Sequence, residues 1–195
     1  MSGLSRKAVF LDRDGVLNED IHLLTKAEDF RILEGVPNAL GQLKDAGFQL
    51  VVISNQPVVA RGLIDVGGVA RLNQALGELI QQSGGPVFDG FYFCPHHPNA
   101  DVEAFRMECD CRKPKLGLIE RACSDHGLDA SQCYMVGDRI TDIAAGRHAG
   151  CRTIQVATGR ENDAPIEGAS DVDLAVRPDH VCSGLPEAAL WILSR

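Results

Sequence analysis

The sequence contains no hydrophobic run long enough to cross a membrane. A spanning helix needs roughly 18 or more consecutive apolar residues, and no such run occurs. Residues 1–7 also lack the apolar segment of a secretory signal. We therefore expect a cytoplasmic protein that has no membrane partner.

A run of lysine and arginine is absent as well. The chain carries 27 acidic and 19 basic side chains, which gives a net charge of −8. An acidic chain without a basic face is a poor candidate for binding nucleic acid, and this argues against a zinc-finger nucleic-acid binder. A small anionic substrate remains compatible, since a few local basic residues decide its binding.

The length and the absence of repeats limit the domain organisation. A chain of 195 residues is long enough for one domain with a hydrophobic core, and it shows no internal repeat or low-complexity segment. We expect a single domain that spans residues 1–195 and acts as a monomer.

Cysteine is present in an odd number and with uneven spacing. Of the seven cysteines, three lie close together at positions 94, 109 and 111. In a cytoplasmic chain of this size a disulfide framework is the weaker interpretation. We expect the remaining four to be small buried hydrophobic residues: Cys123, Cys133, Cys151 and Cys182.

Short apolar runs alternate with helical patterns along the chain. Runs rich in branched or aromatic residues predict buried strands at 8–11, 50–53, 134–136 and 153–156. Helical periodicity with flanking Pro or Gly residues predicts helices at 36–46, 66–82, 116–126, 140–149 and 186–193. Residues 159–170 have the composition of a surface loop. This alternation predicts an α/β fold, a three-layer Rossmann-like sandwich whose mainly parallel sheet has helices on both faces.

Polar signatures follow three of these strands. Asp-Arg-Asp-Gly occupies 12–15, Ser-Asn-Gln occupies 54–56 and Gly-Asp-Arg occupies 137–139. In open α/β sheets, ligands bind beyond the carboxyl ends of the strands. A single pair of aspartates is often just a turn, but three polar strand ends in one sheet predict a functional site.

These residue types suit the transfer of a phosphoryl group. A carboxylate such as Asp12 can attack phosphorus and form an aspartyl-phosphate, which divides one difficult displacement into two easier steps. A second acid, Asp14, can protonate the leaving alkoxide and later activate water. Gly15 would let the backbone turn sharply, so that both carboxylates reach one phosphate.

The same reaction needs positive charge around the phosphate. Asp138 can complete a magnesium site, and Ser54 with nearby N–H groups can hold phosphate oxygens. Lys113 in the CRKPK segment is the candidate that neutralises the transferring group. Lys115 is the competitor, but it follows Pro114 near a helix start and is expected to face solvent.

Four segments together resemble a known enzyme family. FLDRDGVLN, VVISNQ, CRKPK and MVGDRITD, in this order, look like the four motifs of the haloacid dehalogenase superfamily of aspartate-nucleophile phosphatases. The resemblance covers roughly residues 7–157. It implies these roles: Asp12 as nucleophile, Asp14 as general acid/base, Ser54 and Lys113 on the phosphate, and magnesium on the side chains of Asp12 and Asp138 and the backbone carbonyl of Asp14.

Asp142 has two interpretations. It lies one helical turn after Asp138, where it could orient the loop as a supporting residue. It could equally be an acid at a helix N-terminus that the helix dipole favours. The sequence leaves both open.

A second group of polar residues lies in CPHHPNADVEAFRMECDC, residues 94–111. Three thiolates and one imidazole make a tetrahedral zinc set, although the one-residue gaps are tighter than usual finger spacing. The set consists of Cys94, His96, Cys109 and Cys111. The alternative is two unrelated buried pairs.

The CPHHP…CDCRKPK pattern is similar to one subfamily, which contains the heptose-bisphosphate phosphatases and the histidinol-phosphate phosphatases. The resemblance implies a structural zinc without an open position, bound through His96 and not through His97. The zinc would fold the loop 94–111 into a minimal cap. It would also hold Arg112 and Lys113 over an open active site for a small substrate.

The substrates of this subfamily differ in what lies beyond the phosphate. A heptose bisphosphate carries a second anion, which suits Arg61 and Arg112, although Arg61 could also be a plain surface arginine. Asn55 and Arg139 complete the expected substrate-binding set. Histidinol phosphate carries cationic groups, which four acids would favour if they border the pocket: Glu19, Asp20, Glu28 and Asp29.

The segment after Ser-Asn-Gln departs from the heptose pattern, because Pro57 and Val58 stand where Ser-Gly is usual. From the resemblance we expect a magnesium-dependent phosphomonoesterase that releases the 7-phosphate of D-glycero-D-manno-heptose 1,7-bisphosphate. This step would supply heptose for cell-envelope glycans such as lipopolysaccharide. A histidinol-phosphate phosphatase is the alternative. A third is an inactive module that binds a phosphorylated ligand or a partner, and the intact catalytic set argues against it.

Overall fold

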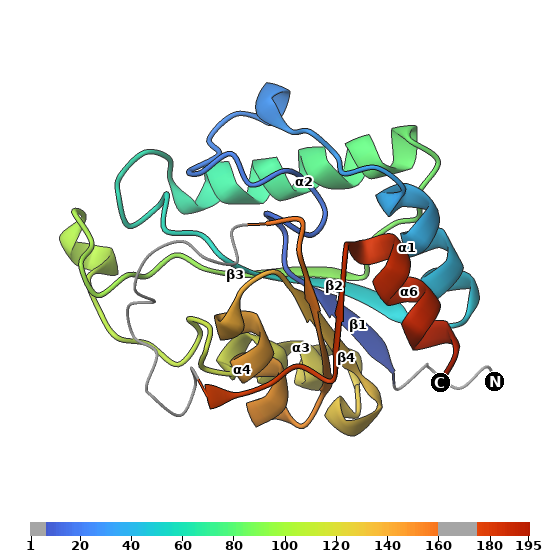
Figure 1. The fold of residues 1–195 in the computed structure, drawn as a ribbon. Coiled ribbons are helices and arrows are strands. Elements are labelled where there is room, and N and C mark those ends of the chain that lie inside the picture. The colour runs from blue at the N-terminus through green and yellow to red at the C-terminus, as the bar shows by residue number, and fades with distance from the viewer. Residues whose placement is uncertain (1–6, 160–174) are drawn as a thin grey trace.

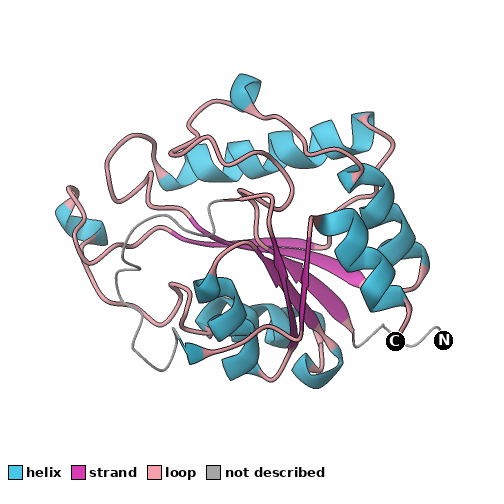
Figure 2. Cartoon of the chain, viewed as in Figure 1, coloured by secondary structure: helices cyan, strands magenta, loops and turns pink. Residues whose placement is uncertain are grey.

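The computed structural model describes residues 7–159 and 175–195, and these form a parallel β-sheet between two layers of helices (Figure 2). Six strands run in the order β3-β2-β1-β4-β5-β6 within the described residues, and every neighbouring pair is parallel. Their bounds are Ala8–Leu11 for β1, Gln49–Asn55 for β2, Gly90–Cys94 for β3, Tyr134–Gly137 for β4, Arg152–Val156 for β5 and His180–Cys182 for β6.

Helices cover both faces of this sheet (Figure 1). One face carries α1 (Val36–Asp45), α2 (Val66–Gln82) and α6 (Leu185–Leu193). The other face carries α3 (Gly117–His126) and α4 (Ile140–Ala149). Short 3-10 helices lie at Ala27–Asp29, Glu103–Phe105 and Ala130–Gln132. The predicted three-layer α/β fold is confirmed.

Strand β1 shows why both faces need a helical layer. Val9 and Leu11 belong to the core under α1, α2 and α6, whereas Ala8 and Phe10 belong to the core under α3 and α4. All four side chains are fully buried. A parallel strand buried on both faces is a continuous apolar run, and this is the signal that the AVFL segment gives in the sequence.

The sequence places most elements correctly but misses two strands. Strand β1 and helices α2 and α4 begin and end at the predicted residues, and the other helices and the other three expected strands differ from prediction by one or two residues at an end. Strands β3 and β6 lie at the two edges of the sheet. Their side chains are mostly half-buried or exposed, so neither gives the buried apolar run that predicts a central strand. The loop expected at 159–170 lies, apart from Gly159, outside the described residues.

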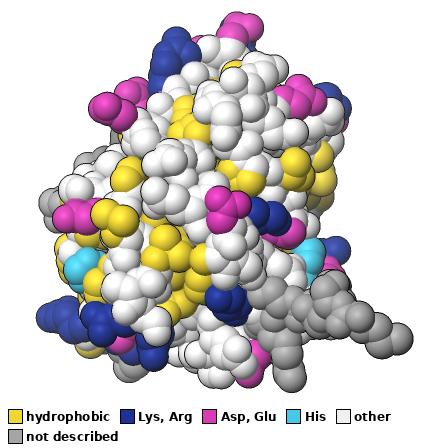
Figure 3. Space-filling view, turned by 90° about the vertical axis from the view of Figure 1, so that its right-hand side faces the viewer, with side chains coloured by type: hydrophobic (Ala, Val, Ile, Leu, Met, Phe, Trp, Pro, Cys, Tyr) yellow, Lys and Arg dark blue, Asp and Glu magenta, His cyan; other side chains and the backbone are white. Residues whose placement is uncertain are grey.

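Helix α6 closes the core on one side of the molecule. Ala188 and Ile192 face inward and are buried, whereas Leu190 is 62% exposed. Viewed from this side, hydrophobic side chains are exposed between charged groups of both signs (Figure 3). Among the described residues, no helix is both long and apolar enough to cross a membrane.

Candidate active site

The topology brings three polar strand ends together. Strand β1 lies between β2 and β4, so the carboxyl ends of these three strands are neighbours. Asp12 follows β1, Ser54 and Asn55 are the last residues of β2, and Asp138 follows β4. The backbone N–H of Asp12 donates to the carbonyl of Val136 at 3.0 Å, which extends the pairing of β1 with β4 up to the first aspartate.

Lys113 reaches this point from a loop that is distant in sequence. Its Nζ lies 2.9 Å from a carboxylate oxygen of Asp12 and 2.6 Å from one of Asp142, and it donates to the carbonyl of Ile53 at 2.7 Å. The side chain is buried, whereas Lys115 is exposed. The structure thus places Lys113, and not Lys115, beside the expected nucleophile.

Asp142 serves both of the purposes that the sequence left open. One carboxylate oxygen accepts from the backbone N–H of Arg139 at 3.0 Å, which caps the start of α4. The other oxygen lies 2.6 Å from Lys113. Asp142 therefore joins the N-terminus of α4 to the buried lysine.

Buried acids outnumber buried bases at this centre. Carboxylate oxygens of Asp12, Asp138 and Asp142 all lie within 4.8 Å of one another. Burial, together with repulsion from the neighbouring acids, raises the pKa of Asp12 to about 6 and that of Asp138 to about 8. Lys113 limits the rise at Asp12, and Arg139 lies 3.8 Å from Asp138. The excess negative charge on oxygen ligands is the environment that a divalent cation requires.

Burial and charge act in opposite directions on Lys113. Burial alone would lower its pKa, but the carboxylates of Asp12 and Asp142 outweigh that effect and raise it. Lys113 is therefore a permanent cation next to Asp12, as the neutralisation of a transferring phosphoryl group requires.

Gly15 follows the two aspartates and allows a close approach of backbone segments. Its φ of +85° lies in the left-handed region. A Cβ atom there would lie 2.8 Å from Oδ2 of Asp138 and 2.9 Å from Cα of Gly159. Thr158 donates through Oγ1 to the carbonyl of Gly15 at 2.6 Å, so the segment after β5 also holds this turn. Thr158 and Gly159 carry no motif that sequence reasoning singled out.

Asp14 lies in a group of polar side chains that sequence reasoning also missed. Its carboxylate accepts hydrogen bonds from Arg13, Asn18 and Gln56. Burial alone would raise the pKa of Asp14, but the guanidinium of Arg13 outweighs it and the pKa is lowered. The only available signal was the position of these residues inside the FLDRDGVLN and VVISNQ segments themselves.

Asn55 has a specific structural contact besides its place at the site. Its side-chain amide donates to the carbonyl of Lys113 at 3.0 Å and accepts from the N–H of Lys113 at 3.0 Å. The end of β2 thus holds the backbone that carries the buried lysine.

A cavity of about 330 Å³ opens above these groups. Asp12, Asp14, Ser54, Asn55 and Lys113 line it together with the three arginines predicted to bind substrate, which are Arg61, Arg112 and Arg139. The arginines differ in their surroundings. Arg61 is exposed, Arg112 donates to the carbonyl of His96 at 3.1 Å, and Arg139 pairs with Asp20 at 3.0 Å. The expected catalytic and substrate-binding residues therefore meet around one pocket, whereas Asp138 is fully buried beside Asp12 and does not line it.

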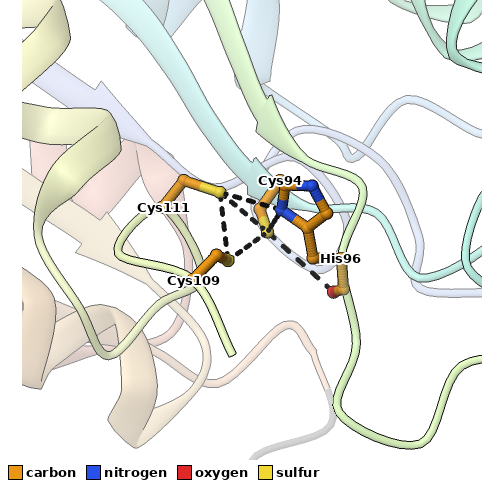
Figure 4. A group of neighbouring side chains, drawn as sticks. All are labelled: Cys94, His96, Cys109 and Cys111. Atoms are coloured by element: carbon orange, nitrogen blue, oxygen red, sulfur yellow. Dashed lines mark hydrogen bonds between the residues drawn. The ribbon is translucent and has the colours of Figure 1, made fainter. Parts of the chain in front are cut away.

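The four expected zinc ligands also meet (Figure 4). Cys94 is the last residue of β3, and its sulfur lies 3.5 Å from Cys109 and 3.2 Å from Cys111. The sulfurs of Cys109 and Cys111 are 3.2 Å apart, and Nδ1 of His96 lies 3.4 Å from Cys111. These side chains point toward one common centre, which excludes two unrelated pairs.

The chemistry of this cluster suits a metal that prefers sulfur and nitrogen. Hydrogen bonds from Cys94 and the other neighbours lower the pKa of Cys111 to about 5, whereas the pKa values of Cys94 and Cys109 are raised, so one thiolate is stable in the cluster without a metal. Three sulfurs and one imidazole nitrogen make a closed four-ligand set, which fits Zn²⁺. His97 lies apart from this set. Its Nδ1 accepts from the N–H of Asn99 at 3.1 Å, and it lines the main cavity.

Comparisons with known proteins agree with this geometry. Residues 110–188 match a family model described as HAD-hydrolase-like. The chain is 41% identical over 174 residues to the D-glycero-beta-D-manno-heptose-1,7-bisphosphate 7-phosphatase of Haemophilus ducreyi, which covers 89% of this chain and 94% of that protein. It is 40% identical to the D-glycero-D-manno-heptose-1,7-bisphosphate 7-phosphatase of Thermosynechococcus vestitus, with 97% of this chain and 96% of that one covered.

A solved structure shows the same architecture. It is the D,D-heptose 1,7-bisphosphate phosphatase from B. bronchiseptica, complexed with magnesium and phosphate. The TM-score is 0.77 at 30% sequence identity, and the alignment covers 96% of this chain and 98% of that chain.

Proposed function

The chain belongs to the haloacid dehalogenase-type family of D-glycero-D-manno-heptose-1,7-bisphosphate 7-phosphatases, and we propose that it hydrolyses the 7-phosphate of this heptose bisphosphate. It is a phosphoric monoester hydrolase, and the reaction fits the supply of heptose for lipopolysaccharide. The single observation that carries the proposal is the contact of Asp12 with the buried Lys113 at the base of an arginine-lined cavity.

The reaction divides into two displacements. The first displacement starts from the protonated form of Asp14, which is the minor form in the free site because Arg13 lowers its pKa. A carboxylate oxygen of Asp12 attacks phosphorus, the bond from phosphorus to the C7 oxygen breaks, and that oxygen takes the proton of Asp14. Water then gives its proton to Asp14 and attacks the same phosphorus, which releases phosphate and restores the carboxylate of Asp12. Lys113 offsets charge on the transferring group, and Ser54 holds a phosphate oxygen.

Magnesium fits the acids at the strand ends. Both oxygens of Asp142 already accept hydrogen bonds, from Lys113 and from the N–H of Arg139. Asp12 and Asp138, with the backbone carbonyl of Asp14, are the residues that would hold the ion, as the family resemblance implies. The hydrogen bonds of Asp142 leave it a supporting role. When bound, Mg²⁺ neutralises negative charge between phosphate and carboxylates and polarises the phosphoryl group. The solved relative complexed with magnesium and phosphate supports this metal.

The charges around the cavity favour a second phosphate over a cationic group. Arg61 and Arg112 line the cavity beyond the lysine, and planar guanidinium groups suit phosphate. Among the four acids considered for a cationic substrate, only Asp20 lines the cavity, and Arg139 pairs with it at 3.0 Å. The negative charge of Asp20, which could attract the cationic groups of histidinol phosphate, is thus already neutralised by Arg139.

The zinc cluster would have a structural role. Arg112 and Lys113 follow Cys111 directly, so fixing the loop 94–111 also fixes where these two cations emerge. The loop packs against the segment that carries Arg61, because the N–H groups of Asp101 and Val102 donate to the carbonyl of Ala60. With this loop as a minimal cap, residues 1–195 would form one catalytic domain.

The test is phosphate release in the presence of magnesium. Each anomer of heptose 1,7-bisphosphate is compared with histidinol phosphate as kcat/KM, and phosphorus NMR identifies which phosphate leaves the sugar. We expect the bisphosphate to be preferred by orders of magnitude, with loss of the 7-phosphate. A preference for histidinol phosphate would contradict the substrate, and no release from any ester would indicate an inactive binding module.

The nucleophile is tested separately. Asp12→Asn removes the attacking carboxylate, so we expect no turnover and an unchanged far-UV circular dichroism spectrum. Turnover by the purified variant, measured before deamidation of the new asparagine can restore the acid, would contradict the assignment of Asp12.

A further inference from the structure

Arg13 stands between the two aspartates of the first motif, and its side chain is 1% exposed. Arginine is rarely buried completely unless other groups satisfy its charge and its five N–H donors. No step of the proposed reaction uses Arg13. The position of its guanidinium therefore needs another explanation.

The guanidinium of Arg13 makes a bidentate contact with the carboxylate of Asp14. Nε donates to Oδ1 at 3.1 Å, and Nη2 donates to Oδ2 at 2.7 Å. A bidentate contact of this kind fixes the orientation of the carboxylate plane as well as the position of the carboxylate. The side chain of Asp14 keeps 25% exposure and lines the cavity beside Asp12.

Two further side chains complete the contacts of this carboxylate. Asn18 donates through Nδ2 to Oδ1 at 2.9 Å, and Gln56 donates through Nε2 to Oδ2 at 3.0 Å. Each oxygen of Asp14 thus accepts two hydrogen bonds. Gln56 Nε2 also lies 2.8 Å from Oγ of Ser54, so the same amide connects Asp14 to the expected phosphate-binding serine.

Hydrogen bonds to Gln56 and Asn73 hold Arg13 itself in place. Nη2 donates to Oε1 of Gln56 at 2.9 Å, and Nη1 donates to Oδ1 of Asn73 on α2 at 3.4 Å. The guanidinium carbon lies 5.8 Å from the centre of the Phe30 ring. Gln56 therefore contacts both members of the Arg13–Asp14 pair, and neither side chain can rotate without breaking hydrogen bonds that are buried at Arg13 and partly buried at Asp14.

From this geometry we propose that Arg13, braced by Gln56, is a positioning residue that fixes the carboxyl group of Asp14 for its two proton transfers. The inference rests on the proposed function, because it takes Asp14 as the general acid/base. A merely structural Arg13 would balance buried charge without any effect that depends on the leaving group. The two roles therefore predict different kinetics.

The experiment compares two leaving groups in Arg13→Met, which keeps an unbranched side chain but removes the guanidinium. The heptose leaves as an alkoxide and needs a proton from Asp14, whereas p-nitrophenolate leaves p-nitrophenyl phosphate without one. We expect kcat on the heptose bisphosphate to fall about 100-fold with KM nearly unchanged. With the aryl ester we expect a fast burst of p-nitrophenol and then slow turnover, because activation of water still needs Asp14.

Three companion variants make the result specific. Asp14→Asn should show the same burst and a larger loss on the sugar. Arg13→Lys keeps the positive charge but cannot make the bidentate contact, so its activity on the heptose bisphosphate should lie between that of Arg13→Met and that of the unmodified enzyme. Arg71→Met makes the same substitution at an arginine on α2 whose side chain is 75% exposed, and should match the unmodified enzyme on both substrates.

The possible outcomes separate the inference from the proposed function. If the burst of p-nitrophenol in Arg13→Met slowed as much as release of the heptose did, or if neither step slowed, the positioning role would be overturned. If Asp14→Asn itself showed no dependence on the leaving group, the assignment of Asp14 as acid/base would fail first. If Arg13→Met did not fold, Gln56→Leu would decide by the same criterion, since it removes one donor to Asp14 and one brace of Arg13.

Discussion

Lys113 and Asp142 lie 2.6 Å apart between Nζ and Oδ1, and both side chains are almost fully buried. Because Asp142 also caps α4, the N-terminus of that helix sets the position of the ammonium group. Asn55 holds the backbone of the same lysine from the end of β2. The ammonium group of Lys113 is thus positioned by Asp142 on α4, whereas its backbone is positioned by Asn55 at the end of β2.

Substitution of Lys113 should lower activity more than substitution of Asp142. Lys113→Met should abolish measurable turnover and destabilise the magnesium-free protein by about 3 kcal/mol, because it leaves neighbouring buried acids uncompensated. Asp142→Asn should retain the cap but lower kcat roughly 10-fold through a misplaced lysine. Steady-state kinetics and urea unfolding measure both effects.

Lys115→Met is the matched control for the lysine. Lys115 lies two residues further on and is exposed, so we expect activity and stability close to those of the unmodified protein. A Lys115→Met variant that lost activity as severely as Lys113→Met would contradict the assignment of the buried lysine.

The central strands and the catalytic motifs could be predicted from the sequence for one physical reason. A parallel strand buried on both faces must be apolar, and polar residues can follow it only where the strand leaves the core. Asp12, Ser54 and Asp138 stand at such transitions, so their meeting follows from the order of the strands. The edge strands β3 and β6 escape the same reasoning because their side chains are mostly not buried.

The residues that hold the catalytic side chains in position could not be predicted from the sequence, for a different reason. Arg13 and Gln56 are charged or polar, and in a sequence both look like exposed loop residues. Their burial depends on a partner brought in by tertiary packing, such as Asn73 from α2. Contacts between polar side chains that are 43 and 60 residues apart leave no periodic pattern in one sequence.

The arginines should decide the preference for a bisphosphate. Arg61→Ala and Arg112→Ala should each lower kcat/KM on the heptose bisphosphate roughly 10- to 100-fold, since each removes a cavity-lining cation that we propose binds the second phosphate. On a sugar monophosphate the loss should be only a few-fold. Arg71→Ala, which lies outside the cavity, is the control for the loss of an arginine. Equal losses on both substrates would mean that the arginines do not recognise the second phosphate.

The raised pKa of Asp138 predicts how stability depends on pH without magnesium. Burial and two neighbouring acids raise this pKa from 3.8 to about 8, so the folded state binds a proton that the unfolded state releases. Asp138 therefore contributes stability that is fully present below about pH 4 and is lost as pH rises toward about 8. Mg²⁺ should restore stability most strongly at the upper end of this range.

Melting temperature as a function of pH, with and without Mg²⁺, measures this effect. Asp138→Asn is the control, because other groups also titrate and only the difference between the two proteins reports on Asp138. The variant should lose less stability with rising pH and should gain little from Mg²⁺. Parallel curves for the two proteins would show that Asp138 does not titrate as its surroundings predict.

Zinc should stabilise the loop that carries Arg112 and Lys113. We expect about one Zn²⁺ per chain by elemental analysis, because the cluster offers one closed four-ligand set. Strong chelation, or Cys109→Ser, should lower the melting temperature by several degrees and increase hydrogen exchange across residues 94–113. Activity should fall even with excess Mg²⁺, because Lys113 follows the ligand Cys111 by two residues.

Cys123→Ser separates this effect from a general effect of losing a thiol. Cys123 is half-buried in α3 and is not part of the cluster, so the variant should keep its zinc, its loop protection and its activity. The decisive comparison is made after analysis shows that zinc has been removed. If melting temperature and magnesium-restored activity were then unchanged, the metal would not be what holds the loop over the site, and the contacts of Asn55 with Lys113 would have to be sufficient alone.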